Sequence, residues 1–410
     1  MKKGIVLLTL LALMLSLVPV GYSETGPVTI TYAFWGNNDQ VPIRLAVIDR
    51  FMEENPDIKV ECQYYTWDVI NGKYVAQAAA GTLPDVMVVA GDWYEQFADK
   101  YLLGLSEFLG SADELTSIPE SLFKVFDQDG KVCAVPFQCA STALYYNKNI
   151  FDEAGIAYPD TTWTWDTFYE VAIQLTKGEG KDRIIGVESI PWATVITSYG
   201  GNLFNEERTE ITLDDERVLK AFTQYQNLAL NHNGIATSAD QDSWAGMPAF
   251  ASGRIAMNLR DFYAIGGYQV IEDFDWDVTL VPAQPDGIRT NIVYVNGHAI
   301  SSTSKHPEEA WRLVSYLSQP DAQAEIMREE GFTPRQDMDL SSYLSEMYAK
   351  PENINIFSEA LSYGIISPAS SGVKQFSDIF FANYDLMMEG KLAPKEAIAK
   401  MVEDMEIIID

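Results

Sequence analysis

The sequence predicts an α/β protein that divides into at least two lobes. Its opening alternates short apolar strands with helices, one strand (residues 86–90) is an unbroken apolar run, and the chain has 410 residues. An unbroken apolar strand is typical of a parallel sheet that helices cover on both faces. A single hydrophobic core stops growing near ~250–300 residues, so a chain of this length is expected to divide.

Local periodicity predicts the first five elements. The expected elements are strands at 28–34, 58–62 and 86–90 and helices at 42–54 and 69–80. In the first two strands, apolar residues alternate with small or polar ones, whereas the third is the unbroken apolar run. The first helix is favoured by Pro42 in its first turn and ends before Pro56, and Gly81 is a typical helix terminator. The opening is therefore β-α-β-α-β, which indicates an α/β lobe.

The remaining pattern continues this alternation. The expected elements are strands at 143–146, 276–281 and 293–301, a short helix closed by Gly155, and helices at 165–175, 218–230, 307–317 and from 394 onward. The helix at 307–317 is amphipathic, with Trp311, Val314 and Leu317 on one face. The sequence has no internal repeat and no linker long enough to separate independent domains.

Charge and composition exclude several classes of protein. The chain has 28 Lys and Arg against 59 Asp and Glu, a formal net charge of -31. Binding to a phosphate backbone needs clustered cations, so we expect no nucleic-acid partner. Hydrophobic residues make up 47% and charged residues 21%, which is ordinary globular usage and excludes a disordered chain.

The first 23 residues have the pattern of a secretory signal peptide. Lys2 and Lys3 precede an apolar run over residues 5–18, and Gly21-Tyr22-Ser23 provides a small-residue cleavage site. A membrane anchor is the alternative, but a spanning helix needs about 20 apolar residues and this run is shorter. We therefore expect export with cleavage after Ser23.

Cysteines and histidines are too few to indicate a metal site or cofactor. The three cysteines are Cys62, Cys133 and Cys139, an odd number for an exported protein. Cys133 and Cys139 could form a disulfide only if Pro136 turns the chain between them, and the sequence leaves this open. The three histidines have no metal-binding spacing, so we expect no metal and no cofactor.

Enzyme motifs are also missing. The sequence has no GxSxG elbow, no phosphate-binding loop of the GxxxxGK[ST] type and no GxGxxG after a strand. A catalytic carboxylate pair cannot be selected among 59 acidic residues by spacing alone. We therefore expect a protein that is not an enzyme.

Aromatic residues stand beside polar ones in several predicted loops. These segments are Trp35-Gly36-Asn37-Asn38-Asp39, Trp67-Asp68, Asp92-Trp93-Tyr94, Trp192 and Ser243-Trp244. Loops after strand ends hold ligands in open α/β sheets. An indole ring matches the C–H face of a pyranose, and polar neighbours can pair with its hydroxyls. Any single Trp could instead anchor the core or the rim, but the set favours a sugar-binding site.

Five stretches, in order along nearly all of the mature chain, resemble the solute-binding proteins of ABC importers, specifically the family that binds sugars and oligosaccharides. These stretches are residues 35–36 with 51–60, residues 79–86, residues 135–166, residues 250–257, and residues 310–311 with 331–335. The resemblance implies a two-lobed periplasmic-binding-protein fold of type II, with a cleft that closes about a hinge. Lobe 1 would comprise 24–137 and 296–333, and lobe 2 would comprise 138–295 and 334–410.

The resemblance also implies a function and a site. A monomer would bind a sugar between its lobes without changing it, and the closed form would deliver it to the permease subunits of the importer. The implied ligand-binding residues are Trp35, Asn37, Asp39, Trp67, Asp92 and Trp93 in lobe 1, Trp192, Trp244, Arg260 and Tyr263 in lobe 2, and Asn296 and Arg335 at the later crossings.

Retention at a membrane is one point where the sequence departs from many relatives. Those relatives carry a cysteine for lipid attachment just after the apolar run, whereas the first cysteine here is Cys62. We therefore expect a soluble periplasmic or extracellular protein. Two alternatives for its function remain: the same fold binding a polyamine or short peptide, which the acidic surface and the Asp-Trp pairs would suit, or a secreted carbohydrate-active enzyme.

Overall fold

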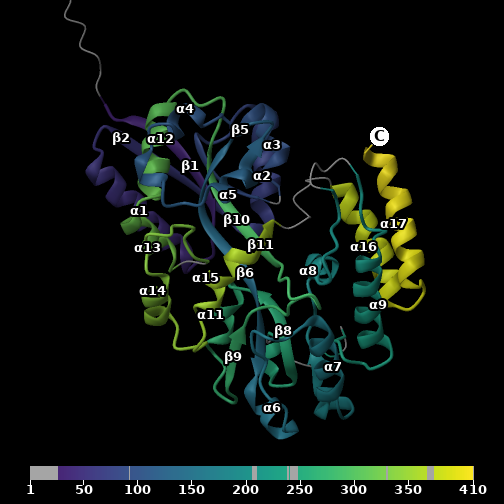
Figure 1. Cartoon of the computed structure of the whole chain (residues 1–410). Coiled ribbons are helices and arrows are strands. Elements are labelled where there is room, and N and C mark those ends of the chain that lie inside the picture. The colour runs from purple at the N-terminus through teal and green to yellow at the C-terminus, as the bar shows by residue number, and fades with distance from the viewer. Residues whose placement is uncertain are drawn as a thin grey trace, which may run out of the picture.

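The computed structural model describes residues 26–409 apart from 92, 206–209, 238–239, 241–247, 329–330 and 367–373. Its helices and strands form two lobes, one above the other in Figure 1, that share one mixed sheet. The strand order in this sheet is β2-β1-β3-β10-β6-β8-β7, with β11 paired to β10 and β9 paired to β6. The expected signal peptide, residues 1–23, lies outside the described residues.

The first five elements confirm the predicted β-α-β-α-β opening. They are β1 (Val28–Trp35), α1 (Gln40–Glu54), β2 (Ile58–Tyr65), α2 (Trp67–Ala80) and β3 (Val86–Ala90). Strand β1 pairs in parallel with both β2 and β3, and β3 is buried along its whole length. Helix α2 ends at Gly81, whose φ of 68° is the left-handed conformation that glycine adopts without strain. These pairings place the carboxyl end of β1 beside the start of α2.

The rest of the upper lobe comes from two separate parts of the chain. The elements are α3 (Glu95–Tyr101), α4 (Ser106–Leu109), α5 (Glu120–Phe123), β4 (Asp127–Gln128), β5 (Lys131–Val132), α12 (Pro307–Leu317) and α13 (Pro320–Ile326). The predicted amphipathic helix is α12: Val314 and Leu317 are fully buried, and Trp311 stacks on Phe108 with ring centroids 5.0 Å apart. Helices α12 and α13 both pack against α1.

Two long strands, β6 (Ala134–Asn147) and β10 (Asn291–Ile300), run through both lobes. The first part of β6 pairs with β10, and its last part pairs with β8 and β9. All residues of β6 are buried. The sequence predicted only its end, residues 143–146. The register between β6 and β10 shifts between Asn296 and Gly297, where a bulge interrupts the ladder.

Strand β6 also decides the disulfide that the sequence left open. Pro136 lies within the extended strand rather than in a turn, so the strand holds Cys133 and Cys139 apart. All three cysteines are free thiols. Burial raises the pKa of the Cys139 thiol, which makes this side chain a poor nucleophile.

The middle and the end of the chain supply the other elements, several of which form the lower lobe in Figure 1. These elements are α6 (Lys148–Ala154), α7 (Trp165–Leu175), β7 (Ile185–Val187), α8 (Trp192–Thr197), α9 (Glu216–Leu230), β8 (Ile255–Asp261), α11 (Ala264–Tyr268), β9 (Trp276–Thr279), α14 (Leu340–Met347), α15 (Ile356–Ala360), β11 (Gly364–Ile366), α16 (Lys374–Met388) and α17 (Pro394–Ile409). The helices predicted at 165–175, 218–230 and from 394 are confirmed. Helices α16 and α17, yellow in Figure 1, pack beside α9.

A buried polar cluster joins strands β1, β6 and β10 to helix α1 in the upper lobe. The Nε2 atom of His298 is 3.0 Å from the hydroxyl of Tyr32, which accepts a hydrogen bond of 2.8 Å from Arg44. The ring of Phe137 stacks on His298 at 3.9 Å. Burial holds the pKa of His298 well below its ordinary value, and the charge of Arg44 acts in the same direction. The imidazole is therefore neutral at physiological pH.

Candidate ligand-binding site

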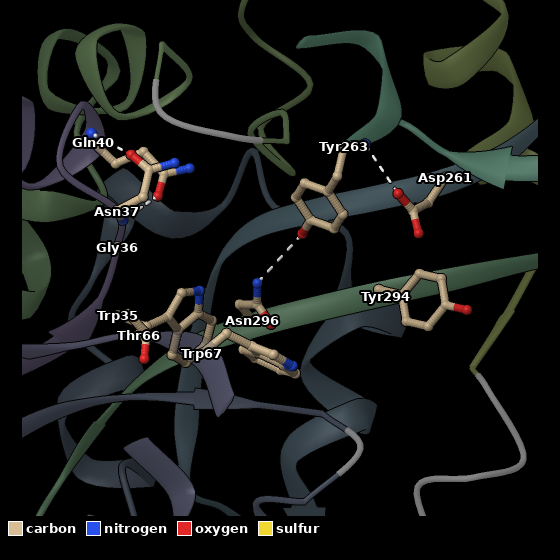
Figure 2. A pocket seen from close by; sticks show the side chains of 10 residues that line it. All are labelled: Trp35, Gly36, Asn37, Gln40, Thr66, Trp67, Asp261, Tyr263, Tyr294 and Asn296. Atoms are coloured by element: carbon tan, nitrogen blue, oxygen red, sulfur yellow. Dashed lines mark hydrogen bonds between the residues drawn. The ribbon is translucent and has the colours of Figure 1, made fainter. Parts of the chain in front are cut away.

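A pocket of about 480 Å³ opens where β1, α2, β8 and β10 meet (Figure 2). It is lined by Trp35, Gly36, Asn37, Gln40, Thr66, Trp67, Asp261, Tyr263, Tyr294 and Asn296. The first six residues lie at or after the carboxyl ends of β1 and β2 in the upper lobe, and the others lie on β10 and at or just after the end of β8 in the lower lobe. The pocket therefore lies between the lobes and beside strand ends, where open α/β sheets hold ligands.

Two tryptophan rings form one wall of the pocket. The rings of Trp35 and Trp67 are nearly perpendicular, with an interplanar angle of 80° and centroids 4.9 Å apart. Trp93 lies behind them, 6.2 Å from Trp35 and 6.3 Å from Trp67, and packs edge-on against Phe97. This edge-to-face packing fixes the orientation of the indoles. The side chain of Trp67 remains 51% exposed, so a flat apolar surface is open to a ligand.

The loop after β1 is fixed by its own side chains. The Oδ1 atom of Asn37 accepts hydrogen bonds from the backbone N–H groups of Asp39 (2.8 Å) and Gln40 (3.1 Å). The Gln40 side chain in turn accepts one from the Asn37 backbone at 2.7 Å. Since its oxygen is used in the loop, Asn37 offers the pocket its Nδ2 group, which is a donor.

The opposite wall links β8 to β10. The Nδ2 group of Asn296 donates to Gln138 Oε1 at 2.8 Å and to the hydroxyl of Tyr263 at 3.4 Å. Both amide hydrogens are then used, which leaves Oδ1 of Asn296 as an acceptor. The Asp261 carboxylate accepts a bond of 3.1 Å from the backbone N–H of Tyr263. Figure 2 shows the two bonds that involve Tyr263 and places this residue between Asp261 and Asn296.

Five of the predicted binding residues meet in this pocket: Trp35, Asn37, Trp67, Tyr263 and Asn296. Trp93 supports the indole wall from behind. Asp39 is exposed in the loop before α1, and Arg260 precedes Asp261 on β8, but neither lines the pocket. Asp92 and Trp244 lie outside the described residues.

Two further predicted residues are held elsewhere in the fold. The ring of Trp192, the first residue of α8, packs against Phe380 of α16 at 4.6 Å. The buried Arg335 donates to the backbone oxygen of Ser318 at 2.8 Å and makes two bonds to Asp337 at 2.9 and 2.6 Å. Neither side chain lines the pocket between the lobes, so a ligand-binding role for each remains only a sequence prediction.

Besides Gly36, which belongs to the predicted loop 35–39, four lining residues were missed in the sequence: Gln40, Thr66, Asp261 and Tyr294. Two of them had a usable signal, because Thr66 precedes Trp67 and Asp261 follows Arg260. Tyr294 lies in a predicted strand between Val293 and Val295, and the alternation alone does not indicate which face of that strand meets a cleft.

The chemistry of the described lining is that of a binding site. Asp261 is its single carboxylate, and the lining contains no histidine, cysteine or lysine. Within the described parts of the chain, no group of three or more His, Cys, Asp and Glu could hold a metal ion. The pocket can stack an apolar face on indole rings and pair donors and acceptors around it.

Comparison with known proteins agrees with this architecture. Residues 37–324 match the family model of the bacterial extracellular solute-binding proteins. A lactose-binding protein of Rhizobium radiobacter is 23% identical over 403 residues, which cover 92% of this chain and 91% of the relative. An arabinooligosaccharide-binding protein of Halalkalibacterium halodurans is 22% identical over 391 residues, covering 86% and 84% of the two chains.

Solved structures show the same fold. An ABC substrate-binding protein of Listeria monocytogenes in complex with cycloalternan superposes with a TM-score of 0.80 at 22% identity, covering 93% of this chain and 99% of the other. A cyclic alpha-maltosyl-1,6-maltose binding protein of Arthrobacter globiformis gives 0.79 at 19% identity, covering 94% and 99%. The predicted two-lobed periplasmic-binding-protein fold is thus confirmed.

The family consists of solute-binding proteins rather than enzymes, in agreement with the missing catalytic motifs. Its members work outside the cytoplasmic membrane, and no helix in the described part of this chain is both long and apolar enough to cross a bilayer. The family model spans well over half of the 410 residues. On this evidence the chain belongs to the family of bacterial extracellular solute-binding proteins.

Proposed function

We propose that this protein captures a sugar or oligosaccharide in the pocket between its lobes and delivers it to the permease of an ABC importer. The observation that carries the proposal is the indole wall of Trp35 and the half-exposed Trp67, opposed by the polar groups of Tyr263 and Asn296. A pyranose has both an apolar face and a rim of hydroxyls, and this pocket offers a counterpart to each. The relatives named for lactose and arabinooligosaccharides support the ligand class.

The position of the pocket supports capture by closure. Trp67 belongs to the upper lobe and Tyr263 to the lower lobe, so a ligand that contacts both favours the closed form. A ligand shifts the balance between open and closed forms only by its differential affinity for them. A permease that binds the closed form would then distinguish the loaded protein from the empty one.

The proposal also covers the oligomeric state, the partners and the location of the protein. We propose a monomer with no nucleic-acid partner, in line with the net charge of -31. We also propose an exported protein without a lipid anchor. One relative that is 26% identical over 326 residues is named as an uncharacterized lipoprotein of Streptomyces antibioticus, so the absence of a lipid anchor needs a direct test. Mass spectrometry of the native protein tests the point: an unmodified chain that begins at Glu24 is expected, and a lipid-modified cysteine would contradict it.

Calorimetry tests the ligand class. The purified protein is titrated with a panel of neutral mono- and oligosaccharides, and binding to at least one of them is expected. Because unpaired buried groups penalise an analogue that lacks a hydroxyl, deoxy analogues should bind far more weakly than the parent sugar. Absence of binding to the whole panel would contradict the proposal.

Asp261 favours a second candidate, a polyamine or a peptide amine in the same pocket, because its carboxylate can pair with a cation. Titration with spermidine at low and high salt separates the two ligand classes. A polyamine site would bind spermidine with an affinity that falls steeply with salt, whereas a neutral sugar would bind equally well at both ionic strengths.

A further inference from the structure

Asp261 is the one charged side chain among the described residues that line the pocket. It ends β8, and its carboxylate is partly buried. One oxygen accepts the backbone N–H of Tyr263 at 3.1 Å. Within the described parts of the chain, no lysine or arginine nitrogen forms an ion pair with it. The second oxygen is therefore a candidate partner for a ligand.

The local electrostatics favour a positive group on the ligand. Burial raises the pKa of the Asp261 carboxyl, and the neighbouring Arg260 opposes that shift only in part. The negative charge of the Asp261 carboxylate is therefore only partly compensated by its neighbours. A cation placed against it would restore the interactions that the carboxylate loses on burial, whereas an anion in the same pocket would be repelled.

The hydrogen-bonding pattern around Tyr263 also favours a positive group on the ligand. Asp261 on one side of the tyrosine and Asn296 on the other both present acceptors, because both amide hydrogens of Asn296 are already bonded to Gln138 and Tyr263. A hydroxyl can donate only one hydrogen, but a protonated amine donates three and accepts none. The rings of Tyr263 and Tyr294 beside these acceptors can add cation-π attraction.

We infer that Asp261 determines the specificity of this pocket and that its ligand is an amino sugar, a saccharide whose protonated amine pairs with the Asp261 carboxylate. This inference rests on the proposed sugar-binding function. It excludes sugars with a carboxylate or a phosphate, because the lining residues that the structure describes offer them no cation. The indole wall of Trp35 and Trp67 would hold the apolar face of the same sugar.

Matched sugars test the inference by calorimetry. The panel contains monosaccharides and 1,4-linked disaccharides of the gluco, galacto and manno series, each in hydroxyl, 2-amino, 2-acetamido and uronic acid form. In at least one series the 2-amino form should bind about tenfold tighter than the hydroxyl form, because charge-assisted hydrogen bonds are about twice as strong as neutral ones. The 2-acetamido form, which has lost the charge, and the uronic acid should show no such gain.

Two variants assign the gain to the carboxylate. Asp261→Asn should abolish the advantage of the amine, and Glu272→Gln, which removes the same charge from an exposed residue outside the lining, should retain it. Circular dichroism and the melting temperature show whether Asp261→Asn is folded. If it is not folded, the test is made on the wild-type protein by calorimetry at two salt concentrations. The affinity advantage of the 2-amino sugar over the hydroxyl form should shrink between about 20 and 500 mM salt.

The outcomes separate this inference from the proposed function. Neutral sugars that bind as well as their amino forms would overturn the inference and leave the sugar-binding function standing. An amine advantage that survives in folded Asp261→Asn, or that salt does not reduce, would also overturn it. If no member of the panel binds, both the inference and the proposed function fail.

Discussion

Replacing Trp67 by alanine measures what the indole wall contributes to binding. A tryptophan side chain presents about 150–250 Å² of surface, and that of Trp67 is 51% exposed, so roughly 100 Å² is open to a ligand. At about 25 cal/mol per Å² of buried apolar surface, a stacked sugar that covers most of this area would gain about 2 kcal/mol there. Trp67→Ala should therefore weaken binding about 30-fold, and Trp67→Phe should retain part of the affinity.

The assay is calorimetry with the sugar that binds the wild-type protein most tightly. The matched control is Trp311→Ala, because Trp311 stacks on Phe108 and does not line the pocket. That variant should lower the melting temperature and leave the affinity unchanged. If folded Trp67→Ala binds within about twofold of the wild-type protein, the ring does not stack on the ligand and the argument from the indole wall fails.

Three further predictions concern the framework around the site. Arg335→Ala removes a bond to the buried oxygen of Ser318 and should lower the free energy of unfolding by about 1–3 kcal/mol in urea titrations; an unchanged value would contradict this structural role. His298 binds a proton only in the unfolded chain between its ordinary pKa and its depressed folded value, so stability should fall as the pH drops below about 6.5. His298→Gln should reduce that slope by up to ~1.4 kcal/mol per pH unit, and equal slopes for the two proteins would count against a neutral buried imidazole. A Cβ atom on Gly186 would lie 2.2 Å from the backbone oxygen of Ala172, so Gly186→Ala should destabilise the packing of α7 on β7 by about 1–3 kcal/mol or more, as judged by the melting temperature.

The local elements were predictable because their signals are local. The strand β3 is an unbroken apolar run, and α2 ends at a glycine that adopts a left-handed conformation. Strand β6 was only partly predicted, because Pro136 and the free thiols in and beside it resemble a turn with a disulfide when seen in sequence alone. Its partners on both sides lie more than a hundred residues away, so tertiary pairing decides its length.

The site was predictable to the extent that its residues follow strand ends. Trp35, Trp67 and Asn37 were found this way, although Trp67 starts a helix instead of lying in a loop. Asp39 was grouped with Asn37 because it is near in sequence, yet the turn that Asn37 makes with its own side chain leaves Asp39 exposed. Trp192 was predicted to bind the ligand but packs against Phe380, which lies almost two hundred residues later. No local sequence pattern indicates that contact.

The two strands that run through both lobes limit how the molecule can be divided. Strand β6 pairs with β10 at one end and with β8 and β9 at the other, and β10 returns to the upper lobe long after the chain first left it. No contiguous fragment therefore carries all the strands of the upper half without also carrying β7, β8 and β9. A truncation after Asn147 would lack β10, the strand that joins β3 to β6. Engineering a half-molecule would need a spliced gene that brings distant segments together, rather than a simple deletion.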